Sequence, residues 1–428
     1  MDFKTHLKKY LSDTEIDKLI SSFNQPEKKG LLLNLNKMSF AQLNEIFPNL
    51  KPHPVITKGF IFNKDEIQPG KKVYHEAGAY YISEPSAMLV SFLLNPTEND
   101  VVLDLCAAPG GKTVQAALRM DDQGMIIAND LSKSRANILL SNIERMGITN
   151  TVVTSLDFSK HSNKFQNYFD KIILDAPCSG SGMFRKSDEM KSDWTYEKVL
   201  KNASIQKDLI LMAYSMLKEG GTMAYSTCSY SFEEDEEVIE HLLSNTDAEL
   251  VDICDQPGYF RSPKYKETIH LFPSHFEGEG HYIALIHKPG ILKRNRMDAY
   301  TYLRENFTKG GVKQYDYIDV NQTLPKGFDN LCLRPGFYKS TRLNNGELIP
   351  SHHASHTKYG PEAIELSKED VVKYLRGESL TLNKKYPDGY YSVSYLDMKL
   401  GLVHSVNGVL KNLYPKGLRI NADIKTSF

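Results

Sequence analysis

The stretch LDLCAAPGGKT, residues 103–113, begins as an apolar strand and ends in a turn of small residues. Gly110 and Gly111 close this turn, and a helical pattern opens at Lys112. Glycines at such a turn let backbone N–H groups approach a ligand that side chains would exclude. The stretch therefore predicts a cofactor turn, although a plain strand-helix connection stays open. Its spacing matches neither G-x-G-x-x-G nor the P-loop, so the nature of the cofactor is undecided at this point.

Around this stretch, short apolar runs that end in polar residues alternate with helical patterns. The runs are VVLDLCA (101–107), MIIAND (125–130), TVVTSLD (151–157), KIILDAP (171–177) and TMAYSTCS (222–229). The helical patterns cover residues 112–120, 134–147 and 205–221. This alternation is typical of a doubly wound α/β fold with a parallel sheet. Two further runs, AELVDI (248–253) and YIALIHK (282–288), would complete seven strands.

A chain of 428 residues exceeds what one hydrophobic core usually serves. We predict a small N-terminal α/β module at 1–74, where helical patterns at 12–23 and 39–47 flank a strand-like LLLNLN. The α/β core follows at 75–288. Residues 289–325 form a basic linker, and residues 326–428 a small strand-rich domain. Between 288 and 345 the chain has 11 Lys and Arg against 5 Asp and Glu, which predicts a basic surface.

The composition is that of an ordinary globular protein, with 41% hydrophobic and 25% charged residues and a net charge of −1. No run is apolar enough to span a bilayer, and the first residues, MDFKTHLKKY, lack the apolar region of a signal peptide. We therefore expect a cytoplasmic protein without a membrane partner. The five cysteines are spread without a C-x-x-C pair, which argues against a disulfide framework or a zinc site.

Acidic residues follow four of the predicted strands, namely Asp104, Asp130, Asp157 and Asp175. An acid after the second strand, about 20 residues beyond a glycine turn, suits hydrogen bonds to ribose hydroxyls. Asp157, one strand further, is placed to meet an adenine edge. Each acid alone is also typical of a helix N-cap or turn. Together, on successive strands, they predict an adenosyl pocket.

Two cysteines follow neighbouring strands: Cys178 in DAPCSG and Cys228 in YSTCSY. We expect both thiols to face one cavity, because their neighbours are Pro, Ser, Thr and Gly rather than core residues. Ser231 and Glu234 form an S-x-x-E capping box, and the positive end of that helix would lower a nearby thiol pKa.

Two clusters invite a metal hypothesis. The acidic run Glu233–Glu237 is interpreted instead as the solvated first turn of a helix. In SHHASH, His352, His353 and His356 have H-x-x-x-H spacing but lack an accompanying Glu or Cys. We therefore expect no metal.

With these residues in view, the sequence resembles the bacterial RNA (cytosine-5)-methyltransferases of the Sun/RsmF type, in the 16S rRNA branch. The matching motifs are HEAGAYYISEPSAML (75–89), DLCAAPGGKT (104–113), NDLSKSR (129–135), SLDF (155–158), DAPCSGSGMFRK (175–186) and YSTCSYSFEEDE (225–236). Further motifs resemble the C-terminal PUA-like extension of that branch: LCLRPGFYK, SHHASHTKYG, VVKYLRGESL and KNLYPKGLR. One departure is LLLNLN, where the family often has Arg-Val-Asn, so an RNA contact by that arginine is in doubt.

The resemblance implies a Rossmann-like, seven-stranded class I methyltransferase core and S-adenosyl-L-methionine (SAM) as cofactor. It implies SAM contacts from the turn residues Cys106, Ala107, Ala108, Pro109, Gly110, Gly111 and Lys112. It further implies SAM contacts from Asp130 toward the ribose, Asp157 toward the adenine, Arg135, and Asp175, which would lie beside the methyl donor and the target base. Cys228 becomes the nucleophile.

The chemistry of cytosine leads to the same residues. Carbon-5 is a poor nucleophile, so a thiolate must first add to carbon-6. Asp175 would stabilise the adduct at the N3 and amino edge. The carbon-5 proton must later be removed so that the Cys228 bond can break, and Cys178 fits this release step. The expected partner is ribosomal RNA or the small ribosomal subunit, and the expected state is a monomer.

Other functions are weighed against this one. A tRNA cytosine-5 methyltransferase stays open, as does a non-catalytic RNA-binding assembly factor, although the intact Cys178, Cys228 and Asp175 speak against the latter. An amino-methyltransferase typically has Asn/Asp-Pro-Pro-Tyr/Phe where this chain has DAPC. A dehydrogenase would need a different glycine spacing.

Overall fold

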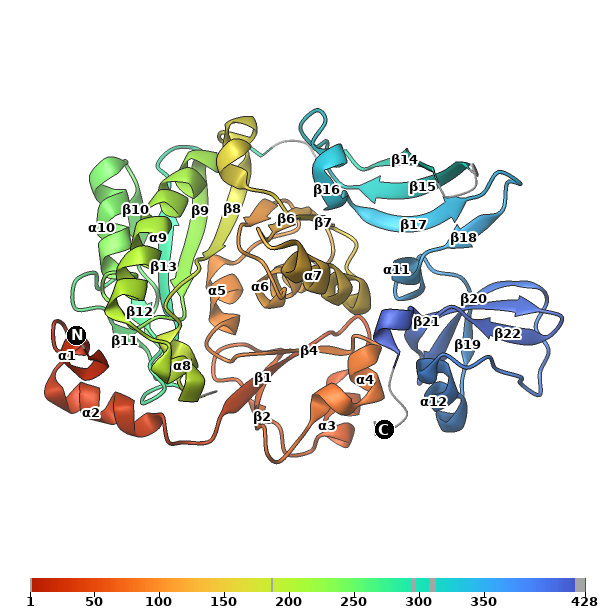
Figure 1. Cartoon of the computed structure of the whole chain (residues 1–428), viewed down its shortest axis with the longest axis horizontal. Coiled ribbons are helices and arrows are strands. Elements are labelled where there is room, and N and C mark those ends of the chain that lie inside the picture. Colours follow the sequence, from red (N-terminus) through yellow and green to blue (C-terminus); the bar gives the residue numbers. More distant parts are fainter. Residues whose placement is uncertain (1, 186–187, 295–297, 308–312, 420–427) are drawn as a thin grey trace.

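A mixed sheet of ten strands forms the centre of the protein (Figure 1). The computed structural model describes residues 2–185, 188–294, 298–307, 313–419 and 428. Five parallel strands lie in the order β7-β6-β5-β8-β9, then β13 pairs antiparallel with β9 and β10 antiparallel with β13. Their bounds are β5 Val101–Asp104, β6 Met125–Asn129, β7 Thr151–Thr154, β8 Phe169–Asp175, β9 Leu217–Thr227, β10 Glu249–Val251 and β13 Tyr282–His287. The seven predicted strands are thus confirmed.

Three short strands extend this sheet. They are β11 Phe260–Arg261 and β12 Ile269–His270 beside β13, and β16 Cys332–Arg334, which pairs antiparallel with β7 at the other edge. β16 comes from beyond residue 326, so the C-terminal third of the chain contributes a strand to the central sheet.

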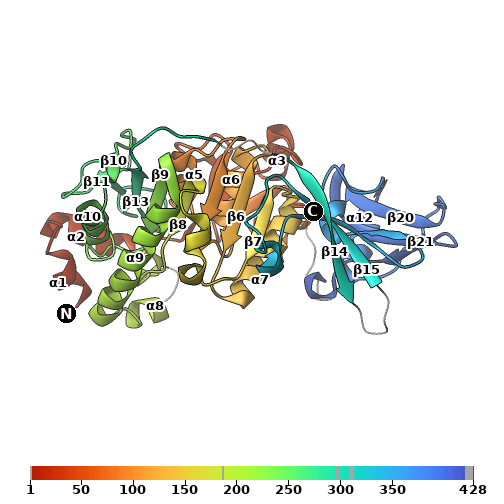
Figure 2. The same cartoon turned by 90° about the horizontal axis from the view of Figure 1, so that it is seen from above.

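Helices cover both faces of the central sheet (Figure 2). On one face lie α5 Met88–Leu94, α6 Gly111–Arg119 and α7 Lys133–Met146, and on the other α9 Tyr196–Met216 and α10 Glu236–Asn245. Because the strands are buried on both sides, they are apolar throughout rather than alternating. In β5, for example, Val101 and Leu103 pack toward α9, whereas Val102 packs toward α5.

The N-terminal module is a four-stranded sheet of order β2-β3-β1-β4 with short helices. Its elements are α1 Phe3–Leu7, α2 Asp13–Ser22, β1 Lys28–Leu33, α3 Phe40–Ile46, β2 Lys51–Pro52, β3 Gly59–Asn63, α4 Val73–Glu76 and β4 Tyr80–Ser83. β1, α2 and α3 match the expected patterns. β4 lies beyond residue 74, where the module was expected to end.

Residues 289–325, expected as a basic linker, contain two strands. β14 Tyr300–Phe307 and β15 Lys313–Val320 form a sheet with β17 Phe337–Arg342 and β18 Leu348–Pro350. Arg296 and Lys309 of this segment lie outside the described residues. The alternation of side chains along β15 places Ile318 and Val320 in the central core, and Tyr302 of β14 packs against it, so this segment packs as part of the fold.

A second small sheet, of order β19-β20-β21-β22, forms the C-terminal domain. The remaining elements are α8 Asp188–Ser192, α11 His352–Ser355, β19 Ala363–Glu365, α12 Lys368–Arg376, β20 Gly389–Tyr395, β21 Met398–Val406 and β22 Val409–Asn412. This domain lies at the opposite end of the molecule from α1 and α2 (Figure 1). It shares one hydrophobic cluster with the N-terminal module, in which Tyr74 contacts Tyr395. Among the described residues, no helix combines the length and apolarity needed to cross a bilayer.

Candidate active site

The turn after β5 leads into α6 and places Lys112 at the carboxyl ends of the strands. Gly110 has a φ of +117°, a conformation that favours glycine, and α6 starts at Gly111. Behind the turn, Thr113 donates a hydrogen bond of 2.6 Å to Asp104. Burial raises the pKa of Asp104 to about 7, although the Thr113 hydrogen bond and Lys112 oppose that rise. Lys112 extends across the strand ends, and its Nζ lies 2.7 Å from an oxygen of Asp175.

Asp130 and Arg135 connect the second strand to this turn. Asp130 is buried, accepts a hydrogen bond from the Ser132 backbone N–H at 2.9 Å and lies 3.3 Å from Arg135. The same guanidinium donates to the Ala108 carbonyl at 2.7 Å. The structure therefore connects three of the predicted cofactor residues, Ala108, Asp130 and Arg135, through the Arg135 guanidinium.

A pocket of about 400 Å³ opens at the ends of β5, β6 and β7. Its lining includes Leu105, Asn129, Leu131, Leu156, Asp157 and Met212. The Leu131 side chain is 73% exposed, which is high for a leucine beside a cavity. An apolar pocket with a carboxylate at its rim fits an adenosyl group.

Asn129 organises this pocket, and the sequence interpretation missed it. Its amide donates to the carbonyls of Leu105 and Leu156 at 3.2 and 3.1 Å and accepts from the Leu156 N–H at 2.9 Å. It also accepts a hydrogen bond from Thr154 at 2.8 Å. One side chain therefore ties together the ends of three strands. An asparagine directly before Asp130 was the available signal.

Asp175 ends β8 and lies between a cation, a hydroxyl and an imidazole. Lys112 Nζ and Ser226 Oγ each donate to it at 2.7 Å, and His281 Nε2 lies 3.6 Å away. Burial alone would raise the pKa of this carboxyl, but Lys112 and His281 outweigh burial and hold the pKa well below its usual range. Asp175 is therefore a carboxylate at neutral pH.

The two predicted thiols meet. β8 and β9 are parallel neighbours with Asp175 opposite Ser226, so the residues that follow each strand lie side by side. The Sγ atoms of Cys178 and Cys228 are 3.1 Å apart. Their hydrogen bond lowers the pKa of Cys228, aided by His281 and Lys112, and raises the pKa of Cys178 together with burial. Cys228 is thus the better nucleophile of the pair.

Glu234 holds the two cysteine loops together. It accepts hydrogen bonds from the Ser179 N–H at 2.7 Å, from Ser229 Oγ at 2.6 Å and from Gln206 at 3.2 Å. Ser179 follows Cys178 and Ser229 follows Cys228. This buried carboxylate therefore fixes the separation of the thiols.

The predicted capping box is wrong. α10 begins at Glu236, and its N-cap Asp235 makes no side-chain cap hydrogen bond. Ser231 Oγ has no partner among the described residues, while Glu234 points to the cysteine loops. A capping box at Ser231 would start the helix at Phe232, whereas α10 starts four residues later, because Glu234 accepts hydrogen bonds from the cysteine loops instead.

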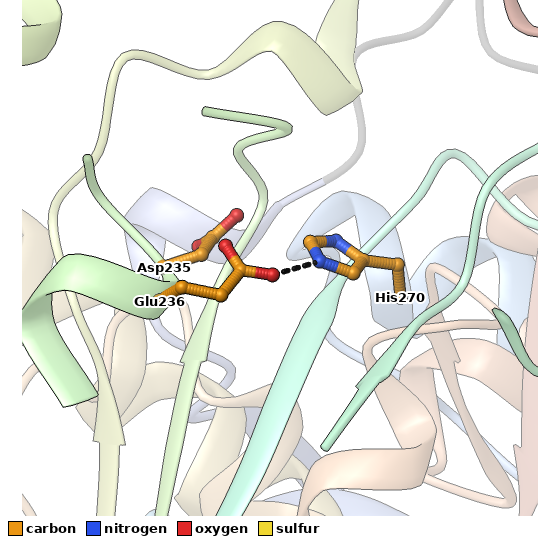
Figure 3. A group of neighbouring side chains, drawn as sticks. All are labelled: Asp235, Glu236 and His270. Carbon is orange, nitrogen blue, oxygen red and sulfur yellow. Dashed lines mark hydrogen bonds and ion pairs between the residues drawn. The ribbon is translucent and has the colours of Figure 1, made fainter. Parts of the chain in front are cut away.

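The acidic run is also not a solvated turn. Glu233, Glu234, Asp235 and Glu236 are all buried. Figure 3 shows Asp235, Glu236 and His270 converging, with His270 Nε2 2.7 Å from Glu236. Asp235 accepts a hydrogen bond of 2.6 Å from Thr227. These contacts tie the start of α10 to β9 and β12, behind the thiols.

The histidines of SHHASH lie far from the thiols in the fold, where α11 packs on α7 and β21. His353 Nε2 lies 2.7 Å from the Ile148 carbonyl, and His352 and His356 contact each other through Nε2 at 3.3 Å. Burial lowers the pKa of His352 to about 4, so its ring is neutral at neutral pH. The three rings belong to the packing between the core and the C-terminal domain.

Two polar residues of the site were not predicted from sequence. His281 precedes β13 and is buried beside Asp175, and Glu84 follows β4 and is half-buried behind His281. They are about 200 residues apart. Glu84 stands in the motif HEAGAYYISEPSAML, which gave no sign of its contact with His281, and His281 stands in none of the quoted motifs.

This strand order and glycine turn, with acids at the strand ends, define a class I methyltransferase that uses SAM. Family models agree along the chain: "16S rRNA methyltransferase RsmB/F" matches residues 91–287, the RsmF N-terminal domain residues 1–85, and the RsmF PUA domain residues 361–420. The chain belongs to the RsmF family of methyltransferases. The predicted family, fold class and cofactor are confirmed.

Among relatives, "Ribosomal RNA small subunit methyltransferase F" of Shewanella loihica is 30% identical, over 94% of this chain and 91% of its own length. The protein of the same description from Vibrio parahaemolyticus is 36% identical over 68% and 64%. Among solved structures, a methyltransferase homologue from Pyrococcus horikoshii is 28% identical, with a TM-score of 0.59 over 66% of this chain and 93% of its own. NSun6 from the same organism, solved with SFG, shares the fold at 22% identity and a TM-score of 0.59 over 68% and 98%.

Proposed function

We propose that this protein transfers a methyl group from SAM to carbon-5 of a cytosine in 16S ribosomal RNA through a covalent adduct with Cys228. The observation that carries the proposal is the pair of thiols 3.1 Å apart beside the Asp175 carboxylate. Methyl transfer to oxygen or nitrogen needs no thiol, whereas carbon-5 of cytosine must be activated by addition of a nucleophile to carbon-6.

Cys228 is the nucleophile. Its thiolate is stabilised by the Cys178 S–H and by the positive charge of Lys112. Addition of Cys228 Sγ to carbon-6 shifts the electron pair of the C5=C6 bond, so that carbon-5 becomes nucleophilic. Bound SAM supplies the electrophilic methyl group on its sulfonium.

Asp175 orients the base. Since Lys112 and Ser226 hold it as a carboxylate, it can accept a hydrogen bond from the cytosine amino group. Its place next to Ser226, two residues before Cys228, brings the amino edge of the base near the thiolate. A cytosine reaches this site only after it leaves its base stack, which single-stranded or loop RNA permits most readily.

Cys178 serves product release. After methyl transfer, carbon-5 still carries its proton, and the Sγ–C6 bond breaks only when a base takes it. Cys178 lies in contact with Cys228, and once Cys228 is bonded to carbon-6 the Cys178 S–H no longer has that thiolate to donate to. After its S–H proton has passed to solvent, the Cys178 thiolate takes the carbon-5 proton, and its raised pKa makes it a strong proton acceptor. Without this group, the protein should stay bonded to its RNA.

SAM would be held by the turn from Cys106 to Lys112, by Asp130 with Arg135, and by the pocket that Asp157 borders. The carboxylates suit ribose hydroxyls and an adenine amino group, and the exposed Leu131 suits an adenine face.

Ribosomal RNA is the proposed partner because the relatives are described as small-subunit rRNA methyltransferases and because the RsmF PUA model matches residues 361–420. The protein would bind this RNA either free or within the small ribosomal subunit, and it would act as a monomer. A tRNA substrate is the second candidate, since the thiol chemistry is the same for any RNA cytosine.

Bisulfite sequencing of total RNA from cells with the gene, without it, and with Cys228→Ala tests the proposal. We expect a 16S rRNA cytosine that is protected only when the wild-type gene is present. A protected tRNA position would show that the substrate is tRNA rather than 16S rRNA. If no RNA contained a protected cytosine, the proposed cytosine-5 activity would be wrong.

A further inference from the structure

A buried histidine that this mechanism leaves unused faces Asp175. His281 directly precedes β13, and the pairing of Tyr282 with Thr227 sets it across from Cys228. Its Nε2 lies 3.6 Å from Asp175 Oδ1 and has no hydrogen-bond partner among the described residues. An imidazole nitrogen is therefore available to the carboxylate that would meet the base.

The other side of the ring is supported by a fixed carboxylate. His281 Nδ1 lies 3.4 Å from Ser86 Oγ and 3.6 Å from Glu84 Oε2. Glu84 accepts hydrogen bonds from the backbone N–H groups of Ser86, Ala87 and Glu279 at 3.0, 2.7 and 2.7 Å. A carboxylate behind one ring nitrogen orients the imidazole, so that Nε2 faces Asp175.

Charged and titratable groups face the ring from four elements: Glu84 after β4, Lys112 on α6, Asp175 on β8 and Cys228 after β9. Glu84 lies on the Nδ1 side of the ring and Asp175 on the Nε2 side. The imidazole therefore lies between two carboxylates, of which only Asp175 would meet the base.

The chemistry of the adduct requires a proton that Asp175 does not carry. When Cys228 adds to carbon-6, electron density moves toward N3, and this nitrogen becomes basic. Lys112 keeps Asp175 ionised, so the carboxylate accepts from the amino group but has no proton of its own for N3. A neighbouring acid must supply it.

We propose that His281 is a positioning residue that holds this proton on Nε2, facing Asp175 Oδ1, and delivers it through the carboxylate to N3. This inference rests on the proposed cytosine-5 activity. As the Sγ–C6 bond forms, the Nε2–H proton passes to Asp175 Oδ1 and this same proton passes on to N3, so that His281 becomes neutral and Asp175 is a carboxylate again. When the Sγ–C6 bond breaks, N3 returns its proton along the same path. His281 is then an imidazolium again, and the carbon-5 proton leaves separately through Cys178.

The test is the pH dependence of single-turnover methylation by His281→Gln. The RNA is small ribosomal subunits from cells that lack the gene, with radiolabelled SAM as the donor. Wild-type activity should fall at alkaline pH, because the relay needs an acid that still carries its proton. His281→Gln should be roughly 100-fold slower and should lose this alkaline fall, so that its rate rises with pH as Cys228 ionises. SAM affinity should be unchanged, and His287→Gln at the other end of β13 should behave as wild type.

A His281→Gln protein that keeps the alkaline fall at the same pH overturns the proposal, whatever its rate. Should that variant fail to fold, Ser86→Ala removes only the hydroxyl between Glu84 and His281. The alkaline fall should then move to lower pH, because the relay loses the hydroxyl that contacts His281 Nδ1, and an unmoved profile overturns the proposal. If the wild-type protein methylates no RNA in this assay, the proposed function fails instead.

Discussion

The Sγ atoms of Cys178 and Cys228 lie 3.1 Å apart although 50 positions separate the two residues in sequence. Each follows one of two adjacent parallel strands, and Glu234 binds the residue after each. The proximity therefore follows from the sheet register and from one buried carboxylate. It also gives the thiols opposite pKa shifts, which is what a nucleophile and a release group require.

The first prediction concerns thiol reactivity. Because the Cys178 hydrogen bond lowers the pKa of Cys228 and raises that of Cys178, limiting iodoacetamide near pH 7.5 should label Cys228 well before Cys178. Peptide mass spectrometry measures both, with the exposed Cys254 as the reference for accessibility. Cys178→Ala should slow the labelling of Cys228. Earlier labelling of Cys178 would contradict the assigned pKa directions.

The second prediction concerns Lys112→Met. The folded pKa of Asp175 is depressed below its unfolded value of about 4, so its contribution to stability is present above pH 4 and lost as pH falls further. Removing Lys112 lets burial dominate and raises that pKa. The variant should be about 1–3 kcal/mol less stable than wild type at pH 7, with the difference shrinking toward pH 4.

Urea unfolding at both pH values measures this difference, and Lys198→Met, an exposed lysine on α9, is the control. The methylation rate of Lys112→Met should also fall about 100-fold. Equal stability of variant and wild type at pH 7 would show that the Lys112–Asp175 pair contributes nothing to the fold.

The third prediction concerns Glu234→Gln. The glutamine amide would present its NH₂ group to donors from Ser179, Ser229 and Gln206, so at least one donor loses its acceptor. We expect a loss of about 2 kcal/mol in the free energy of unfolding and a lower methylation rate at unchanged SAM affinity. Glu240→Gln, on the exposed side of α10, is the matched control. A Glu234→Gln protein with wild-type stability and rate would refute this role.

The fourth prediction concerns RNA binding. Lys384 and Lys385 are exposed on the C-terminal domain. The double change to Glu should weaken binding to small ribosomal subunits and reduce its salt dependence by about one to two phosphate contacts, without affecting SAM binding. Lys198→Glu with Lys201→Glu on α9 is the control pair. If both pairs of changes weakened binding equally, RNA binding would depend on the net charge of the protein and not on this surface of the C-terminal domain. Point changes are preferable to deleting 326–428, because β16 belongs to the central sheet.

Much of the fold could be predicted because parallel strands are continuous apolar runs that end in polar residues. KIILDAP and TMAYSTCS showed both the strands and the thiols that follow them. The two strands at 300–307 and 313–320 were missed, because their charged and tyrosine-rich sequence was interpreted as a linker. Along these strands, inward side chains alternate with exposed ones. The many charged residues and tyrosines obscured this two-residue period.

The site could be predicted where one motif carries several groups, as in DAPC and the glycine turn. It could not be predicted where tertiary packing decides. Glu234 matched a capping box by spacing, yet the donors of two loops turn it inward. His281 meets Glu84 and Asp175 only after β4 and β13 are placed, so no local pattern contains all three.

The most direct test of the account is the covalent complex between protein and RNA on a denaturing gel. Wild type, Cys178→Ala and Cys228→Ala are each incubated with SAM and small ribosomal subunits from cells that lack the gene. We predict a stable protein–RNA band for Cys178→Ala, a faint or absent band for wild type, and none for Cys228→Ala or the double variant. A band formed by Cys228→Ala, or full turnover by Cys178→Ala without any band, would contradict the assigned roles of the two cysteines.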